Sequence, residues 1–246
     1  MKIYHYTSIE TLALILNTKK IRFNRLDFVD DLEESLYGSG PTEIRLGQYT
    51  FVSCWTKDSK ENIALWNMYT KNKGVRIGLD ADMFVTYSIN KNLKSFFKDD
   101  MVSGNALFQT FPNEAKLYEI KYVQDVESNV LNLMKKVGEN GAGIKTEEMG
   151  LYKREEWAFQ KECRFKIIAF PLPPFGVYNM GRALRENKPV DMDHIDIPLK
   201  EEVLDSIEIM LGPQTTEGER IIVKSLLANL KNATIVDSYF KGKIKK

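Results

Sequence analysis

An acidic residue stands at the start of one of the most apolar stretches of the chain. Glu162 precedes Cys163 and the run Phe165–Phe170, which is typical of a buried strand and is followed by the proline-rich segment 171–174. A carboxylate in such a place is solvated at the strand end, is paired with a neighbouring cation, or serves chemistry. Arg164 is a ready partner, so pairing is the simplest explanation, and the rest of the chain decides whether chemistry is added.

Two hydrogen-bonding side chains alternate along the predicted N-terminal strand, Lys2–Tyr6 and the residue after it. His5 and Thr7 fall on one face of such a strand, whereas Tyr4 and Tyr6 fall on the other. A lone histidine on a strand is most often satisfied by the backbone. A hydroxyl two positions away gives the same face a second polar group, which suits a polar ligand such as a ribose.

Two tryptophans form the third candidate constellation. Trp55 ends the predicted strand Gln48–Trp55, and Trp66 lies on the helix predicted after it, with ten residues between the two. A strand, a turn and a helix of this length can bring two indole rings face to face and form a slot for a flat heterocycle. The alternative is that both rings belong to the core, which aromatic content alone favours.

The remaining side chains exclude several common sites. His5 and His194 are the only histidines, and with Cys54 and Cys163 they match no usual zinc spacing, so no metal site is predicted. The Gly-x-Ser-x-Gly elbow of serine hydrolases is missing from the sequence. Each cysteine lies in an apolar strand-like run, where a thiol is usually inert packing rather than a nucleophile.

The acidic segment 30–34 has two competing explanations. It contains Asp30, Asp31, Glu33 and Glu34, without the spacing of a calcium loop. A solvated face of a short helix is the simpler explanation. A lid over a bound ligand is the other, and the roles of Asp30, Asp31 and Glu34 stay open.

Composition sets the broad class of the protein. The chain has 246 residues, of which 43% are hydrophobic and 28% charged, so we expect one domain over residues 1–246. The 35 basic and 34 acidic residues give a net charge of +1, which provides no overall field to attract nucleic acid or a membrane. Free cysteines, no recognisable signal peptide and no membrane-length apolar run predict a cytoplasmic protein with no membrane partner.

Short strands separated by irregular stretches, with helices early and late, predict an α+β fold rather than a doubly wound sheet. Strands are expected at Lys2–Tyr6, Ile21–Asn24, Gln48–Trp55, Val75–Leu79, Lys116–Val123, Cys163–Phe170, His194–Ile197, Ile207–Leu211 and Thr234–Tyr239. Helices are expected after Ser8 as far as Thr18, after Ser59 through Tyr69, and at Met83–Tyr87, Val126–Val137 and Glu217–Leu230.

Taken in order, these features resemble the ADP-ribosyltransferase superfamily. The resemblance rests on a His-x-Thr first strand, an aromatic pair ten residues apart, and a late strand entered through a glutamate. The chain looks most like an uncharacterised bacterial branch of that superfamily. The matching motifs are Phe23-Asn24 before the acidic segment, Trp66-x-x-Tyr69, Trp157 followed by Glu162-x-Arg164, and the turn Ile209–Pro213. They span nearly the whole chain.

The resemblance implies a split β-sandwich of ADP-ribosyltransferase type, with flanking helices and a cleft that binds NAD as a substrate. It implies that His5 and Thr7 bind the adenosine-side ribose, that Trp55 and Trp66 hold the nicotinamide ring, and that Glu162 is the catalytic carboxylate at the nicotinamide ribose. Tyr69 joins the cofactor-binding residues through the Trp-x-x-Tyr motif.

Other assignments also come from the resemblance. Tryptophans replace the usual tyrosines, so Ser53 is an alternative working residue on the Trp55 strand. Gln160, two positions before Glu162, is expected to orient the acceptor nucleophile. Arg22 and Arg76 are candidates for the pyrophosphate because a guanidinium fork suits phosphate oxygens, with surface ion pairing as the competing explanation.

The expected activity is transfer of ADP-ribose from NAD to a macromolecular acceptor, either protein or nucleic acid. The bacterial relatives suggest a toxin or defence effector, of toxin-antitoxin or phage-defence type, with an antitoxin as a candidate partner. Two alternatives stay open: an NAD glycohydrolase that uses water as the acceptor, and a non-catalytic binding module on the same fold.

Overall fold

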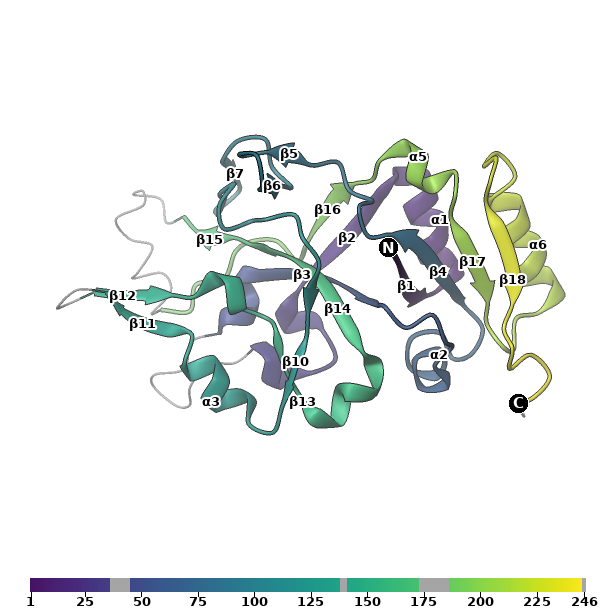
Figure 1. Ribbon diagram of the computed structural model, residues 1–246, viewed down its shortest axis with the longest axis horizontal. Coiled ribbons are helices and arrows are strands. Elements are labelled where there is room, and N and C mark those ends of the chain that lie inside the picture. The colour runs from purple at the N-terminus through teal and green to yellow at the C-terminus, as the bar shows by residue number, and fades with distance from the viewer. Residues whose placement is uncertain (36–44, 138–140, 173–185, 245–246) are drawn as a thin grey trace.

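The computed structural model describes residues 1–35, 45–137, 141–172 and 186–244, and within them the fold is α+β, as predicted. Its largest sheet has nine strands, in the order β16-β2-β3-β1-β4-β17-β18, with β14 paired to β3 and β9 paired to β14 (Figure 1). These strands are β1 (Lys2–Thr7), β2 (Lys20–Arg25), β3 (Thr50–Thr56), β4 (Val75–Asp80), β9 (Tyr118–Glu119), β14 (Glu162–Ile168), β16 (His194–Pro198), β17 (Glu208–Leu211) and β18 (Thr234–Asp237).

Smaller strands and short helices surround this sheet. The strands are β5 (Tyr87–Ser88), β6 (Lys94–Ser95), β7 (Met101–Ser103), β8 (Ala106–Phe108), β10 (Lys121–Val123), β11 (Met134–Val137), β12 (Gly141–Ile144), β13 (Tyr152–Arg154) and β15 (Phe170–Pro171). The α-helices are α1 (Ile9–Thr18), α2 (Ile63–Thr70), α3 (Val126–Leu131), α5 (Glu201–Leu204) and α6 (Glu217–Leu226). The 3₁₀ turns are η1 (Leu26–Phe28), η2 (Leu32–Ser35), η4 (Leu46–Tyr49), η5 (Thr146–Glu148) and η6 (Glu155–Gln160).

Strand β3 is the junction of the fold. β14 pairs along its full length, from Glu162 opposite Thr56 to Ile168 opposite Thr50, and so occupies one edge of β3. The other edge is shared, because β2 pairs at positions 51 and 52 whereas β1 pairs only at Thr56. Between these two contacts, at positions 53–55, β1 and β2 separate from each other. The sheet therefore opens at this point.

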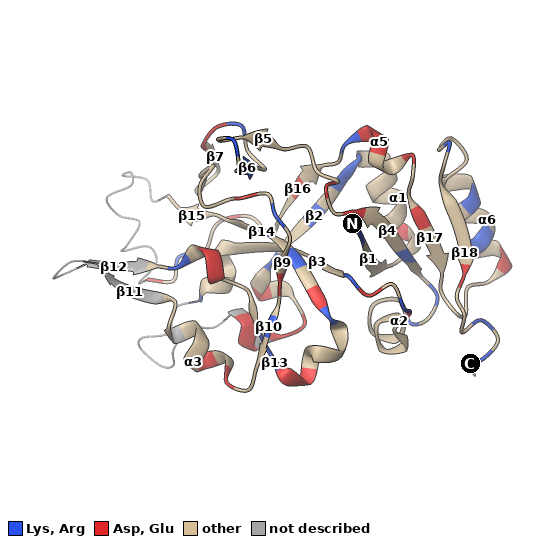
Figure 2. Ribbon diagram, viewed as in Figure 1, with Lys and Arg blue, Asp and Glu red and all other residues tan. Residues whose placement is uncertain are grey.

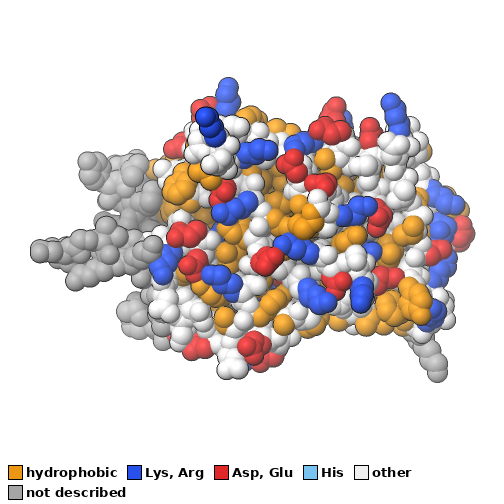
Figure 3. Space-filling model, in the orientation of Figure 1, with side chains coloured by type: hydrophobic (Ala, Val, Ile, Leu, Met, Phe, Trp, Pro, Cys, Tyr) orange, Lys and Arg blue, Asp and Glu red, His pale blue; other side chains and the backbone are white. Residues whose placement is uncertain are grey.

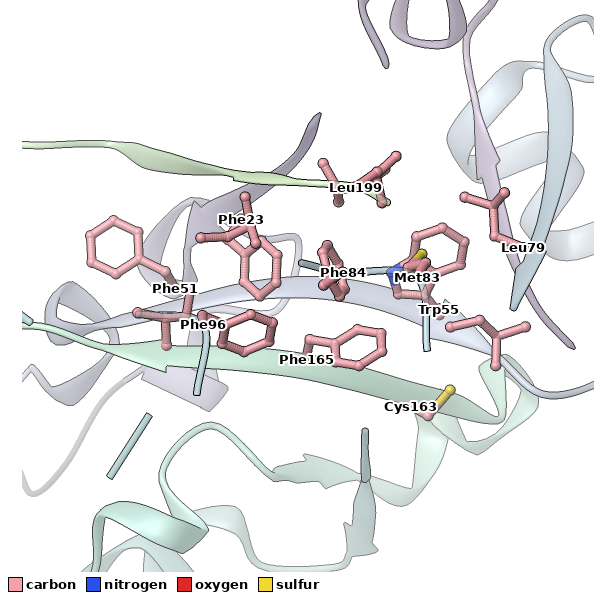
Figure 4. Close-up of a cluster of buried hydrophobic side chains, with 14 of the residues drawn as sticks. Phe23, Phe51, Trp55, Leu79, Met83, Phe84, Phe96, Cys163, Phe165 and Leu199 are labelled. Carbon is pink, nitrogen blue, oxygen red and sulfur yellow. The ribbon is translucent and has the colours of Figure 1, made fainter. Parts of the chain in front are cut away.

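Alternation along the paired strands β3 and β14 divides their side chains between two faces. One face carries the apolar members, and Figure 4 shows Trp55, Cys163 and Phe165 within the main hydrophobic core beside Phe84 and Phe96. The opposite face carries the polar members, which are Cys54, Thr56, Glu162 and Arg164. Alternation thus places Glu162 away from the core although its strand is buried.

Helix α1 connects the two diverging strands. Ser8 caps its first turn, since its side chain accepts a hydrogen bond from the amide of Thr11, as the sequence predicts. Leu12 and Ile15 are buried in the main core, and α1 also contacts α6. The helix ends at a left-handed Lys19, which turns the chain directly into β2.

Several predicted elements differ in extent. Helix α2 begins at Ile63 with Asn62 as its cap, not at Ser59, because the Asn62 side chain accepts from the amides of Ala64 and Leu65. No helix forms at 83–87: Met83 and Phe84 are buried in the core, and Phe84 bridges to Leu199. The helix expected at Val126–Val137 ends at Leu131, and the chain then forms strand β11.

Charge and apolar surface are distributed without large blocks. Lys and Arg alternate with Asp and Glu along the ribbon (Figure 2), and both signs are interspersed on the face seen in Figure 3. In the part of the chain that the structure describes, no helix combines the length and apolar character needed to cross a bilayer.

Candidate functional site

A cleft of about 460 Å³ lies where β1 and β2 separate. Its lining comes from α1, from facing positions of β1, β2 and β3, from the segment between β2 and η2, and from residues of α2, β13 and β14. His5, Thr7, Ser53 and Glu162 all line this cleft. The structure therefore brings together the acid, the imidazole and the hydroxyls expected from the sequence.

Glu162 belongs to a buried network of four charged side chains. One of its oxygens accepts from Nε and Nη2 of Arg164, and the other accepts from Lys153 Nζ at 3.0 Å. Glu34, whose side chain is 0% exposed, completes the network, with its two oxygens 2.9 Å from Lys153 Nζ and 2.7 Å from Arg164 Nη1. Two anions and two cations leave the network neutral, which is what allows it to be buried.

Electrostatics keep the Glu162 carboxylate ionised. Burial alone would raise its pKa, but the charges of Arg164 and Lys153 outweigh burial and lower the pKa to about 2. The pKa of Lys153 is raised for the converse reason: burial acts to lower it, and the carboxylates of Glu162 and Glu34 more than compensate. Glu162 is therefore an anion at neutral pH and an acceptor of hydrogen bonds, not a proton donor.

The Cys54 thiol lies close to Glu162 and stays protonated. Burial, together with the Glu162 charge, raises the pKa of Cys54 well above its ordinary value. The thiol therefore keeps its proton beside the Glu162 carboxylate. This is the opposite of a reactive cysteine, which needs a lowered pKa.

His5 has a defined tautomer. Its Nδ1 lies 2.8 Å from the carbonyl oxygen of Cys54, so Nδ1 carries the proton and donates it. Burial lowers the pKa of His5, and the backbone hydrogen bond only partly opposes this effect. The ring is neutral at neutral pH, which leaves Nε2 as a hydrogen-bond acceptor. Thr7 also lines the cleft, two positions further along the strand.

Gln160 and Tyr69 form the end of the cleft nearest α2. Gln160 is buried, its Oε1 accepts from Lys153 Nζ at 2.8 Å, and its Nε2 donates to Tyr69 Oη at 3.1 Å. Both ends of the Gln160 amide are thus occupied within the wall. Tyr69 is 42% exposed and lines the cleft.

The two tryptophans do not form the predicted slot. Trp55 lines the cleft but is only 3% exposed, because alternation places it on the core side of β3 (Figure 4). Its indole N–H donates to Ser53 Oγ at 2.9 Å. Trp66 is fully buried on the inner side of α2, edge-on to Tyr6 with ring centroids 4.8 Å apart, and lies outside the cleft lining. Each indole packs in a separate cluster, so the face-to-face arrangement expected from their spacing is wrong.

The two arginines expected near a pyrophosphate are placed differently. Arg22 lines the cleft with a half-exposed side chain and pairs with Asp196, Nε to Oδ1 at 3.1 Å. Arg76 is buried away from the cleft, with its guanidinium carbon 4.4 Å from the centre of the Tyr4 ring and its Nη1 donating to the Ser59 carbonyl. Of the two candidates, only Arg22 is within reach of a ligand in this cleft.

Two cleft residues have roles that the sequence does not predict. Glu34 stands out in the sequence only as part of an acidic segment, and Lys153 belongs to none of the motifs. The buried ion pairs join Glu34 to positions about 120 to 130 residues away along the chain, so no local pattern could reveal them. The only signal for Glu34 in the sequence is the density of acidic residues at positions 30–34.

Comparisons with known proteins gave no match. No family model, no curated protein and no solved structure is similar enough to this chain to be matched to it. The geometry and charges of the cleft are therefore the basis for assigning a function.

Proposed function

We propose that this protein is an NAD-dependent ADP-ribosyltransferase on a split β-sandwich, and that it modifies a macromolecular acceptor, either protein or nucleic acid. The observation that carries the proposal is one cleft, opened by the separation of β1 and β2, that is lined by His5 and Thr7 on one strand and by an ionised Glu162 on another. The cleft is of the size that a small-molecule ligand occupies.

The chemistry requires an anion at one end of the cleft. When the bond between nicotinamide and ribose breaks, nicotinamide leaves with the electron pair and the sugar develops oxocarbenium character. A carboxylate aimed at that sugar becomes more favourable as the positive charge grows, so it stabilises the transition state more than the bound substrate. The acceptor nucleophile then forms the new bond to the sugar and releases its proton.

The other cleft residues supply binding and orientation. Neutral His5 offers Nε2 to a ribose hydroxyl, and Thr7 offers a second hydroxyl on the same face of β1. Lys153 and Arg164 fix the Glu162 carboxylate in one orientation through hydrogen bonds to both of its oxygens. On this proposal Gln160 acts on the acceptor side through Tyr69, its exposed neighbour.

Nicotinamide release tests the proposal directly. Purified protein is incubated with NAD alone, with cell lysate and with RNA, and free nicotinamide is measured. The Glu162→Gln variant should release nicotinamide at least about a hundredfold more slowly while binding NAD nearly as well, because the lost interaction is made in the transition state. Glu202→Gln, an exposed acid on α5, is the matched control and should be unchanged.

The same assay separates the competing functions. Release that needs lysate or RNA supports transfer, release in buffer alone supports an NAD glycohydrolase, and NAD binding without release supports a non-catalytic module. Full activity in Glu162→Gln would remove the catalytic assignment. If transfer is found, we infer a cytoplasmic toxin or defence effector, with an antitoxin as the partner that would cover the cleft.

A further inference from the structure

The cleft contains an aromatic ring that no motif pointed to. Trp55 lines the cleft but is only 3% exposed, and Trp66 lies outside it, so a flat heterocycle in this cleft needs a more open surface on which to stack. Among the described residues that line the cleft, Phe28 and Tyr69 are the aromatic side chains most open to solvent, at 59% and 42%. Tyr69 is hydrogen-bonded to Gln160, and Phe28 is a second aromatic surface, from a different element.

Phe28 is held in place from behind. It ends η1, directly after β2, and the guanidinium carbon of Arg25 lies 4.6 Å from the centre of its ring. Arg25 is itself fixed: its side chain is only 11% exposed, it pairs with Asp27 at 2.7 Å, and it donates to the carbonyls of Val190 and Met192 at 3.0 and 3.2 Å. One face of Phe28 is thus covered by a fixed cation, and the ring remains more than half exposed.

The surroundings of the ring suit a base rather than a charged group. Leu14 of α1 lines the same cleft and is 58% exposed, although large apolar side chains are normally withdrawn from water where they can be. An exposed aromatic ring and an exposed aliphatic side chain from two different elements give the cleft an apolar section. Aromatic rings bind nucleic-acid bases through such surfaces because every base offers a flat π face.

We propose that Phe28 is the stacking platform for the adenine ring of the dinucleotide. The inference rests on the proposed function for the identity of the ligand, but it concerns the half of NAD that does not react. Phe28 would then fix the adenosine end of the ligand while Glu162 faces the ribose of the nicotinamide end.

The cation behind the ring decides between the two bases of NAD. The negative charge density on the face of a phenyl ring attracts cations, and Arg25 already occupies one face of Phe28. The nicotinamide ring of NAD is itself a pyridinium cation, so placing it on the other face would bring two positive groups to opposite sides of one ring. The Asp27 carboxylate, 2.7 Å from Arg25 Nε, offsets part of that charge, so the repulsion weakens nicotinamide stacking without abolishing it. Adenine is neutral and meets no such penalty.

Calorimetric titration of ligand fragments tests this without requiring catalysis. The ligands are AMP and ADP-ribose, which contain adenine, and nicotinamide mononucleotide, which does not. Phe28→Ala should weaken AMP and ADP-ribose binding by about tenfold or more, in keeping with the loss of one base-aromatic stack. Nicotinamide mononucleotide should bind within about twofold of the parent protein, and Phe28→Trp should restore the affinity for both adenine ligands.

Phe111→Ala is the matched control, because Phe111 is 72% exposed and does not line the cleft. It should leave all three affinities unchanged. Unchanged ADP-ribose binding in Phe28→Ala would overturn the proposal. So would an equal loss for adenine and nicotinamide ligands, or a parent protein that binds neither AMP nor ADP-ribose. If ADP-ribose binding depends on Phe28 but the protein releases no nicotinamide, only the proposed activity is refuted.

Discussion

Glu162 shows how burial and charge decide the role of a single side chain. Its carboxylate is deep in the protein, yet two cations hydrogen-bond to it and hold it ionised. The arrangement keeps the group anionic at neutral pH, and it also fixes the carboxylate in one orientation. Fixed orientation matters for a group that must meet a developing charge, because a preorganised charge need not reorganise during the reaction.

Glu34 should be essential for this arrangement, although it does not itself carry chemistry. Replacing it by glutamine leaves Lys153 and Arg164 facing one carboxylate, with a net buried charge of +1. We expect Glu34→Gln to lower the free energy of unfolding by about 3 kcal/mol, as for a broken buried ion pair, and to lower kcat more than it raises KM. Urea denaturation and nicotinamide-release kinetics measure the two effects.

Glu33 provides a matched control for Glu34. It is the preceding residue, its side chain is 53% exposed, and it pairs with the equally accessible Arg154. Glu33→Gln should change stability by less than about 1 kcal/mol, as for exposed ion pairs. The double variant Glu34→Gln with Lys153→Met restores the charge balance and should recover part of the lost stability. Equal effects of Glu33→Gln and Glu34→Gln would contradict the network argument.

At the scale of single elements, periodicity predicted most of the secondary structure. The strands around His5, Ile77, Cys163 and Ile209 and the helix capped by Ser8 all form close to their predicted limits. Each carries an apolar pattern with a period that only one type of element satisfies. The error at Met83 and Phe84 arose because a short apolar stretch fits a helix and a buried irregular segment equally well.

The two tryptophans show why spacing alone could not predict the cleft. Their separation by ten residues allowed a facing pair, but the face on which each ring falls depends on where β3 begins and on which residue caps α2. The sequence suggested Ser59 as that cap and the structure has Asn62. Because successive side chains of β3 point to opposite faces, Cys54 lies on the side of Glu162 and Trp55 on the side of the core. Contacts between residues more than a hundred positions apart, such as Glu34 with Arg164, leave no local pattern in the sequence from which they could be predicted.

Asn62 therefore has a testable role at the start of α2. Its Oδ1 accepts from two backbone amides of the first turn, and its Nδ2 donates to the Phe159 carbonyl at 2.7 Å, next to Gln160. Asn62→Ala should lower the free energy of unfolding by about 1 kcal/mol, the usual effect of losing a helix cap. Thermal or urea denaturation measures the change.

The same substitution within α2 is the control for Asn62. Asn67 is exposed on this helix, and its side chain accepts only a long hydrogen bond from Asn72 Nδ2 at 3.5 Å and binds no backbone amide of the first turn. Asn67→Ala should therefore be neutral or slightly stabilising because alanine is the better helix former. A comparable loss of stability in both variants would show that the Asn62 cap is not the cause.

The whole molecule depends on how the strands meet at the cleft. β3 pairs with β14 along one edge, and with both β2 and β1 along the other edge. The cleft is the gap between β2 and β1 on that second edge. The position of β1 is fixed from its other side by β4 and by the turn that precedes β4. Gly74 in that turn accepts a hydrogen bond from the amide of Gly212, and so also ties the turn to the end of β17.

A side chain at Gly74 would disturb this junction. A Cβ atom there would lie 2.2 Å from the carbonyl oxygen of Thr7 and 2.8 Å from Cβ of Thr70, so backbone must move. We expect Gly74→Ala to lower the free energy of unfolding by at least about 2 kcal/mol, as overpacking does. Because Thr7 lines the cleft, the variant should also bind ADP-ribose more weakly.

Gly218→Ala is the control with the opposite sign: this exposed position in α6 has nothing within 4 Å of the added carbon. Removing a glycine from the helix should stabilise the protein by about 0.5–1 kcal/mol. A Gly74→Ala variant as stable as the parent protein would show that close packing at Thr7 does not hold β1 at the cleft, and equal destabilisation by both variants would show that the loss is not specific to Gly74.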